Sequence, residues 1–462
     1  MGWYIRPMAG SSRRPRGLRA GIVVVPGAVR RARLDAGLTL AQLAEPHYTR
    51  AALSYVESGQ RRPSSTMLVQ IAKRTEKPLT HFIDSPGVTP QHRDAIGQLQ
   101  RLVSTLALAE AIAFGERLLE AELPREVEAE ARFLVGRACV RSADGGRAYP
   151  HLVRARHLYE LLGDQIQLAD TLNQLACALL LLDDVRALPV AHEALDACER
   201  VSPEQPELMV RTLILLGGLF FRLQDFHRAE QCYNRALQHL GSVPGIRNLA
   251  MIHDQLNMTY QRMGRFSEAL EHAHKAMKLY RGSVDPTDLF RAEHNLGETL
   301  LKQGELQAAR PYLERALALC EQPELQRYFH GYALLSMAEL HLGFGDLDLA
   351  ELRLTQALDL AERLSERSHE ANAWRLWGRL HSLRGGYEPA AHAFANAARL
   401  FKELELPVDV FDVQLEHARA LQSQGRTSEA CALFDAAGTS AQHAVRRIQG
   451  AWADLMAAGG QA

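Results

Sequence analysis

The chain has 462 residues, a formal net charge of −1 and 6% aromatic residues. This length exceeds what one hydrophobic core usually serves, so we expect several domains or a repeat array. Residues 1–85 hold 14 Lys or Arg against 5 Asp or Glu, whereas the remainder holds 39 against 49. The basic front is suited to binding a polyanion, while the acidic remainder would be repelled from the same surface.

Several classes of function lack a sequence signal. The six cysteines lie far apart with no CxxC pair, and His272 and His274 are two residues apart and so point to different sides of a helix. We therefore expect no metal and no cofactor. A Gly-rich phosphate loop, GxSxG and HExxH are missing, which disfavours an enzyme. No apolar run approaches the ~20 residues of a membrane span, so we expect a cytoplasmic protein without a membrane partner.

The front of the chain breaks into short pieces. Residues 1–25 are Arg-rich and interrupted by Pro and Gly, which indicates a disordered basic tail. In residues 26–84 we expect four short helices, beginning with one that ends at Gly37. The expected caps of the other three are Thr39, Thr49 and Ser65. Ser85-Pro86-Gly87 is typical of a linker.

Large aliphatic side chains and one alanine recur through these four helices at helical spacing. They predict one shared core, formed by Leu34, Leu40, Leu43, Ala44, Leu53, Val56, Leu68 and Ile71.

The segments AGLTLAQLAE (36–45), TRAALSYVESGQRRPS (49–64) and TMLVQIAKRTEKPLTHF (66–82) resemble the phage-repressor-type, or XRE-like, helix-turn-helix. The resemblance implies sequence-specific binding to double-stranded DNA, with Thr49 as the cap of the recognition helix. Glu57 is interpreted as an anchor of the turn rather than a base reader. The implied base-reading residues are Arg50, Ala51, Ser54 and Tyr55. The implied phosphate contacts are Thr49, Ser58, Arg61 and Arg62.

An internal repeat follows, marked by two small residues seven positions apart in an Ala-rich helix. The pairs are Ala229/Ala236, Ala269/Ala276, Ala309/Ala316, Ala350/Ala357, Ala390/Ala397 and Ala430/Ala437. A glycine, or Gln224 in the first unit, marks the turn before each pair. This pattern resembles the tetratricopeptide repeat, lengthened to about 40 residues, over 206–445. Residues 90–205 are expected to hold weaker helical repeats of unknown register. The predicted fold class is all-α, a helix-turn-helix domain followed by a tetratricopeptide-like α-solenoid.

The first helices of such an array line its concave face, where peptides usually bind. Candidate groove residues in this register are Arg211, Asp254, Gln255, Gln261, Arg262, His294, Asn295, Glu298, Glu339, Asn372, Arg375 and Arg379. For each of them an ordinary solvated helix face remains an alternative.

The domain order resembles the RRNPP peptide-pheromone receptors. This resemblance implies a regulator whose repeats bind a peptide or protein effector and form a homodimer. The alternative is a protein-interaction scaffold whose front domain no longer reads DNA.

Overall fold

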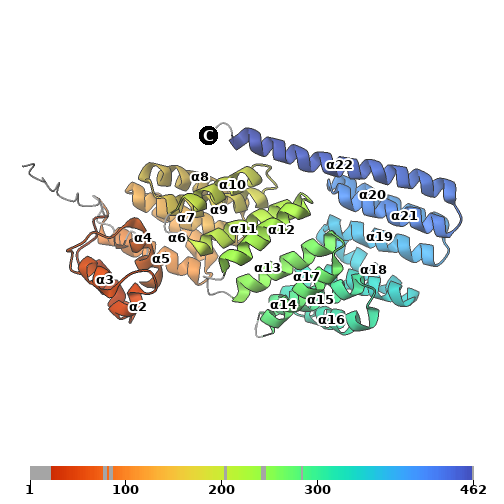
Figure 1. The fold of residues 1–462 in the computed structure, drawn as a ribbon, viewed down its shortest axis with the longest axis horizontal. Coiled ribbons are helices and arrows are strands. Elements are labelled where there is room, and N and C mark those ends of the chain that lie inside the picture. Colours follow the sequence, from red (N-terminus) through yellow and green to blue (C-terminus); the bar gives the residue numbers. More distant parts are fainter. Residues whose placement is uncertain are drawn as a thin grey trace, which may run out of the picture. The chain divides into compact units, whose positions relative to one another are not determined.

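The computed structural model describes residues 22–75, 77, 81–82, 87–201, 205–240, 246–281 and 285–459. Its elements are the helices α1 to α22 (Figure 1), which confirms the expected all-α class. The chain divides into two compact units, Met1–Gln167 and Leu168–Ala462. Most of the predicted tail, residues 1–21, and the predicted linker residues Ser85 and Pro86 lie outside the described part.

Unit 1 begins with a four-helix head. The head contains α1 (Ala28–Asp35), α2 (Leu40–Ala44), α3 (Arg50–Glu57) and α4 (Ser65–Thr75). After it come α5 (Pro90–Ser104), α6 (Leu108–Leu118), α7 (Arg125–Arg141) and α8 (Gly145–Leu162). The helix α9 (Gln165–Leu181) starts at the end of this unit.

The head has its own core, and most of the predicted core residues are in it. Leu43, Ala44, Leu53, Val56, Leu68 and Ile71 are buried together, with Leu40 partly buried against them. The prediction for Leu34 was wrong, since this side chain is 58% exposed. Helix α1 instead buries Ala28, Val29 and Ala32, which places Leu34 on the opposite side.

Two further details of the head differ from expectation. The cap of α4 is Ser64 rather than Ser65, because the Ser64 Oγ accepts the amide of Met67 at 3.2 Å. Residues assigned to the tail also belong to the packed head. The amide of Ile22 bonds to the Pro63 carbonyl at 2.9 Å, and that of Val25 bonds to the Phe82 carbonyl at 2.7 Å.

Unit 2 consists of antiparallel helix pairs. After α9 they are α10 (Ala187–Arg200), α11 (Pro206–Arg222), α12 (Phe226–Leu240), α13 (Ile246–Arg262), α14 (Phe266–Tyr280), α15 (Pro286–Lys302), α16 (Leu306–Leu319), α17 (Pro323–Phe344), α18 (Leu347–Leu364), α19 (Arg367–Leu383), α20 (Tyr387–Glu403), α21 (Pro407–Ser423) and α22 (Thr427–Gly459). The odd-numbered helices are the first helices of the hairpins. All twelve alanines of the predicted pairs are buried on the second helices, as expected for close helix packing.

The hairpin turns repeat in register along the sequence. Each contains one residue with a left-handed backbone, at intervals of 40 or 41 residues: Ala143, Asp183, Gln224, Gly264, Gly304, Gly345, Gly385 and Gly425. Ala143 and Asp183 establish the repeat register within residues 90–205, which could not be assigned from the sequence.

Close approach of the two helices in a hairpin requires glycine at particular positions. A Cβ on Gly217 would lie 2.5 Å from the Tyr233 ring, and one on Gly378 would lie 2.7 Å from the Phe394 ring. Both distances are shorter than van der Waals contact, so the aromatic side chain of the second helix occupies the space that a larger residue would need.

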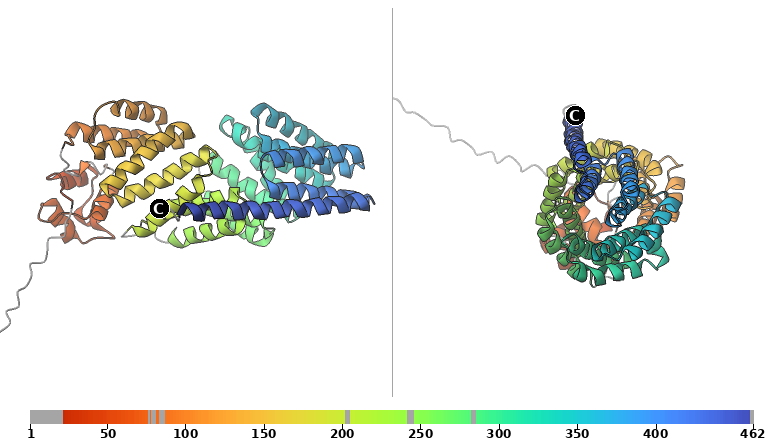
Figure 2. Two further views of the ribbon diagram at one scale, coloured as in Figure 1. Left: turned by 90° about the horizontal axis from the view of Figure 1, so that it is seen from above. Right: turned by 90° about the vertical axis from the view of Figure 1, so that its right-hand side faces the viewer.

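Unit 2 closes on itself through contacts between distant hairpins. The side chain of Gln224, in the α11–α12 turn, donates to Asp409 Oδ2 at 2.7 Å and accepts the Val408 amide at 3.1 Å. Arg262 donates to Asp409 Oδ1 at 2.9 Å. We call these bonds the Asp409 clasp. Helices α10 and α22 are also in contact. The end-on view of Figure 2 shows the hairpins of unit 2, yellow to blue, wound around a common axis.

Candidate functional site

Helix α3 presents one side to solvent because its other side is fixed in the core. Thr49 caps the helix, and its Oγ1 accepts a hydrogen bond from the amide of Ala52 at 3.2 Å. Leu53 and Val56 are buried in the head. The helical period therefore turns the remaining positions outward. The predicted base-reading residues, Arg50, Ala51, Ser54 and Tyr55, are all exposed.

Glu57 holds α3 to α1. Its carboxylate accepts two bonds from the Arg33 guanidinium, at 2.7 Å and 3.1 Å. The hydrogen bond to Glu57 is the main reason that the pKa of Arg33 is raised. A bidentate pair of this kind fixes the relative orientation of the two side chains as well as the distance between them. The structure therefore places Glu57 as an anchor, in agreement with its interpretation from the sequence.

The turn after α3 continues the same exposed region. Ser58 Oγ and the Arg61 amide both bond to the Tyr55 carbonyl, at 3.2 Å and 3.0 Å. Ser58, Arg61 and Arg62 are exposed, and neither arginine forms a recorded ion pair within the described part of the chain. The structure thus brings the predicted DNA-contacting residues together on α3 and its turn, which we call the α3 face.

Unit 2 contains a cavity of about 1680 Å³ bordered by its first helices. Of the candidate groove residues, seven line it: Gln261, Arg262, His294, Glu298, Glu339, Asn372 and Arg375. Five others are not among its lining residues: Arg211, Asp254, Gln255, Asn295 and Arg379. Asp254 is 1% exposed and bonds to Asn295 at 3.1 Å. Arg211 pairs with Asp170, and Gln255 accepts a bond from Tyr233.

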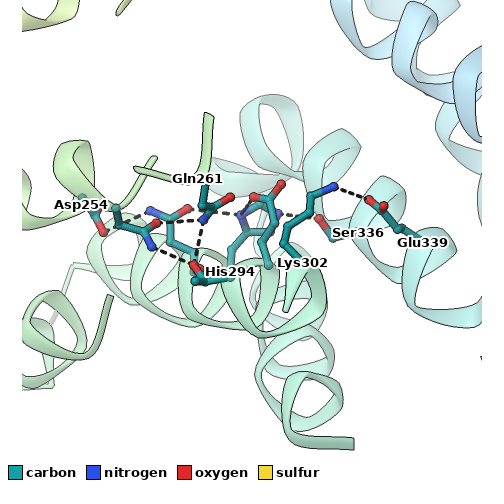
Figure 3. A network of polar contacts seen from close by, with 10 residues as sticks. Asp254, Gln261, His294, Lys302, Ser336 and Glu339 are labelled. Atoms are coloured by element: carbon teal, nitrogen blue, oxygen red, sulfur yellow. Dashed lines mark hydrogen bonds and ion pairs between the residues drawn. The ribbon is translucent and has the colours of Figure 1, made fainter. Parts of the chain in front are cut away.

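Consecutive first helices are joined by polar contacts along this wall (Figure 3), which we call the polar ladder. Between α13 and α15, the amides of Asn257 and Gln261 donate to Thr299 Oγ1 at 2.7 Å and 2.8 Å. Between α15 and α17, His294 Nε2 lies 3.0 Å from Ser336 Oγ. Of these ladder residues, Gln261 and His294 are side chains that the sequence offered as ligand contacts.

Glu339 is the most heavily bonded acid of the ladder. It accepts from Lys302 at 2.9 Å and from Arg379 at 2.6 Å. Burial opposes its ionisation, but Lys302, Arg375 and Arg379 outweigh burial and hold the pKa of Glu339 below its usual range. Arg375 in turn donates to Glu416 at 2.9 Å. Charges of both signs on this wall are therefore largely compensated by each other.

Sequence reasoning missed several lining residues: Lys302, Tyr332, His369, Asp409, Asp412 and Glu416. Tyr332 is 49% exposed although it lies in the cavity wall. The signal that could have found them is the turn register, since each lies on a first helix at a fixable distance before the left-handed turn residue.

Two other expectations concern metals and membranes. Within the described residues, no group of three or more His, Cys, Asp or Glu is placed to hold a metal ion. His272 lies 2.9 Å from His253, Nδ1 to Nδ1. Among the described helices, none is both long and apolar enough to cross a membrane.

Comparisons with known proteins agree with this organisation. Residues 29–82 match a helix-turn-helix family, residues 210–238 a tetratricopeptide repeat, and residues 257–458 the MalT-like TPR region. No curated protein sequence matches the chain.

Solved structures share the fold at low sequence identity. A Rap protein complexed with competence and sporulation factor is 13% identical, with a TM-score of 0.60 over 77% of this chain and 99% of that one. The apo quorum sensor NprR from B. thuringiensis is 17% identical, with a TM-score of 0.58 over 76% and 98%. NprR with its cognate peptide NprX is 17% identical, with a TM-score of 0.52 over 74% and 97%. The chain combines an XRE-like helix-turn-helix domain with tetratricopeptide-like repeats, in an architecture similar to that of the RRNPP receptors.

Proposed function

We propose that the chain is a sequence-specific DNA-binding transcriptional regulator controlled by a peptide or protein effector. The observation that carries the proposal is the α3 face, where residues suited to base edges and to phosphates are exposed on one helix and its turn. Arg50 is suited to a bidentate contact with guanine, and Ser54 can bond to either class of base. Thr49, Ser58, Arg61 and Arg62 are suited to the phosphates on either side.

The domain limits that we propose with this function are the ones predicted from the sequence. Residues 26–84 bind DNA, residues 206–445 form the repeat array, and 90–205 add weaker repeats. The effector occupies the cavity of unit 2, contacting lining residues such as Asn372. This assignment is supported by the likeness in fold to NprR, which is solved with its cognate peptide.

The proposed regulator acts in the cytoplasm as a homodimer, because one head of this kind covers one half-site and paired heads cover two. The effector then changes the affinity for DNA by favouring one arrangement of the dimer. Coupling of this kind is typically worth about 1–3 kcal/mol, which is about 5- to 150-fold in affinity.

The test is repeated selection of the full-length protein on a random pool of DNA duplexes. We expect enrichment of a motif made of two half-sites separated by about 10 base pairs or a multiple of that distance. On this duplex the double variant Arg50→Ala, Ser54→Ala should bind about 100-fold more weakly, because a base contact is worth about 1–3 kcal/mol.

The matched control for the double variant is Arg117→Ala on α6, whose side chain bonds only to a backbone carbonyl of its own helix among the recorded contacts. It should leave DNA binding unchanged. Thermal unfolding of both variants should resemble that of the parent protein, since the replaced side chains are exposed. Unchanged retention of the double variant on every selected duplex would contradict the proposal.

A further inference from the structure

One part of the cavity in unit 2 differs from the rest of its wall. Tyr332 on α17 is a large side chain that remains 49% exposed. The edge-to-face contact between Tyr332 and His369 of α19 has ring centroids 4.2 Å apart. His294 of α15 lies at 6.2 Å from the Tyr332 ring and stacks on Phe290. Tyr332, His369, His294 and the neighbouring lining residue Glu298 define what we call the Tyr332 subsite.

His369 brings a buried ring nitrogen without a hydrogen-bond partner to the wall of this subsite. The residue is 9% exposed and lines the cavity, and its Nε2 has no hydrogen-bond partner. Its other nitrogen, Nδ1, lies 3.8 Å from the Glu366 carboxylate. This neighbour favours the tautomer with the proton on Nδ1. Burial lowers the pKa of His369, so the ring is neutral near pH 7 and Nε2 offers a lone pair to a donor.

The acids around Tyr332 are not compensated as the ladder acids are. For Glu298 and Glu366 the recorded ionic neighbours are His294 at 3.9 Å and His369 at 3.8 Å, and neither acid is within bonding distance of a Lys or Arg in the described part of the chain. After burial, these two carboxylates are the causes that raise the pKa of Tyr332, which places both near its ring.

The nearby lining cations are already engaged. Lys302 is bonded to Glu339, Arg262 to Asp409, and Arg375 to Glu416. The subsite therefore combines an accessible aromatic ring, an acceptor nitrogen without a donor, and a carboxylate without a cation. An anionic ligand would be repelled by Glu298 and Glu366, and a neutral aromatic ligand would leave the His369 acceptor unfilled.

We propose that the Tyr332 subsite binds a positively charged side chain, lysine or arginine, of the peptide effector. The inference rests on the proposed function and adds the chemistry of the ligand. The cation lies against the Tyr332 ring, is neutralised by Glu298 and donates a hydrogen bond to His369 Nε2. Attraction between cations and aromatic rings and the charge-assisted bond to a carboxylate both favour this class of side chain over a neutral one of equal size.

The experiment uses the full-length protein and an immobilised library of random heptapeptides with free termini. Peptides that carry lysine or arginine should be enriched. In the best arginine peptide, replacement of that arginine by citrulline, which keeps the shape and removes the charge, should weaken binding about tenfold, measured by calorimetry.

Variants then connect the charge to the subsite. In Glu298→Gln and in Tyr332→Leu the arginine and citrulline peptides should bind about equally, whereas Tyr332→Phe, which keeps the ring, should still prefer arginine about tenfold. The control Glu362→Gln replaces an exposed acid on α18 that is not among the lining residues of the cavity, and should also keep the preference.

The outcomes separate this inference from the proposed function. Peptide capture without enrichment of basic residues, or an arginine preference that survives both Glu298→Gln and Tyr332→Leu, overturns the subsite while leaving an effector-binding protein. If no peptide binds the parent protein, the peptide form of the proposed function is contradicted and the subsite falls with it.

Discussion

The α3 face and the cavity wall of unit 2 both carry many polar side chains, but these side chains differ in their partners. Arg50, Arg61 and Arg62 are exposed and have no recorded ion pair within the described residues. In the polar ladder, Arg375 of the cavity wall and the neighbouring Arg379 are held by carboxylates of adjacent first helices. A ligand that binds the α3 face breaks few hydrogen bonds or ion pairs within the protein. A ligand that binds the cavity wall competes with the bonds of the polar ladder, unless it contacts side chains that the ladder leaves unpaired. This difference separates polar residues that build the array from those available for recognition.

The largest expected effect comes from removing the ladder's central acid. Glu339→Gln leaves Lys302 and Arg379 with a weaker acceptor in a partly buried position, so the free energy of unfolding should fall by about 3 kcal/mol. Chemical denaturation measures it. The control Glu351→Gln removes a surface partner of Arg384 and should change stability by less than about 1 kcal/mol. Equal effects of the two variants would show that the ladder is no more structural than a surface ion pair.

The difference in stability between the parent protein and Glu339→Gln should decrease in acid. The pKa of Glu339 is lower in the folded chain than its ordinary value of 4.5. The contribution of ionised Glu339 to the free energy of unfolding is therefore complete above about pH 4.5, and it is lost as the pH falls through the folded-state pKa. The parent protein and Glu339→Gln should accordingly converge in stability in acid. A stability difference that stays constant down to pH 3 would contradict this account.

A smaller effect is expected from filling the space between the helices of a hairpin. In Gly378→Ala the new methyl group would meet the Phe394 ring, and we expect about 1–3 kcal/mol of destabilisation by overpacking. Gly218→Ala is the control, because its nearest neighbour, the Tyr233 hydroxyl, is 4.0 Å from the added Cβ. That variant should be neutral or slightly stabilising, since alanine is the better helix former. Thermal unfolding that ranks the two in the reverse order would contradict the packing argument.

The smallest effect is expected at the edge of the α3 face. Each of Arg61→Ala and Arg62→Ala should lower the slope of log affinity against log salt by about 1, because one phosphate contact is lost. The preference between DNA sequences should stay the same, since phosphates carry no base identity. Filter binding across salt concentrations measures both quantities. A changed sequence preference with an unchanged slope would place these arginines on base edges instead.

The sequence predicted the hairpins well because their signals are local. Alanine pairs and glycine turns recur every 40 or 41 residues, and those alanines are buried as expected. The repeat register of residues 90–205 could not be assigned from the sequence, because Ala143 and Asp183 occupy the left-handed turn position where the repeats from Gly264 onward have glycine. Leu34 was misplaced because α1 is short, and a small error in its phase moves a residue from core to solvent.

The site was harder to predict than the fold. The residues of α3 could be listed because a capped helix with a buried side fixes which side chains point outward. The ladder could not, because Asp254 and Asn295 lie 41 positions apart and meet only when successive hairpins stack. The turn register could place Tyr332 on a first helix, but the exposure of its side chain depends on how the hairpins around the cavity are arranged.

The Asp409 clasp changes how an array of this kind is expected to come apart. Linear solenoids fray from their terminal repeats, because each of these has a single neighbour. Here Gln224 bonds to a residue 185 positions further along the chain, and α10 contacts α22. Closing the circle gives every hairpin of unit 2 neighbours on both sides. Amide protons throughout this unit should then exchange with solvent through shared rather than stepwise opening.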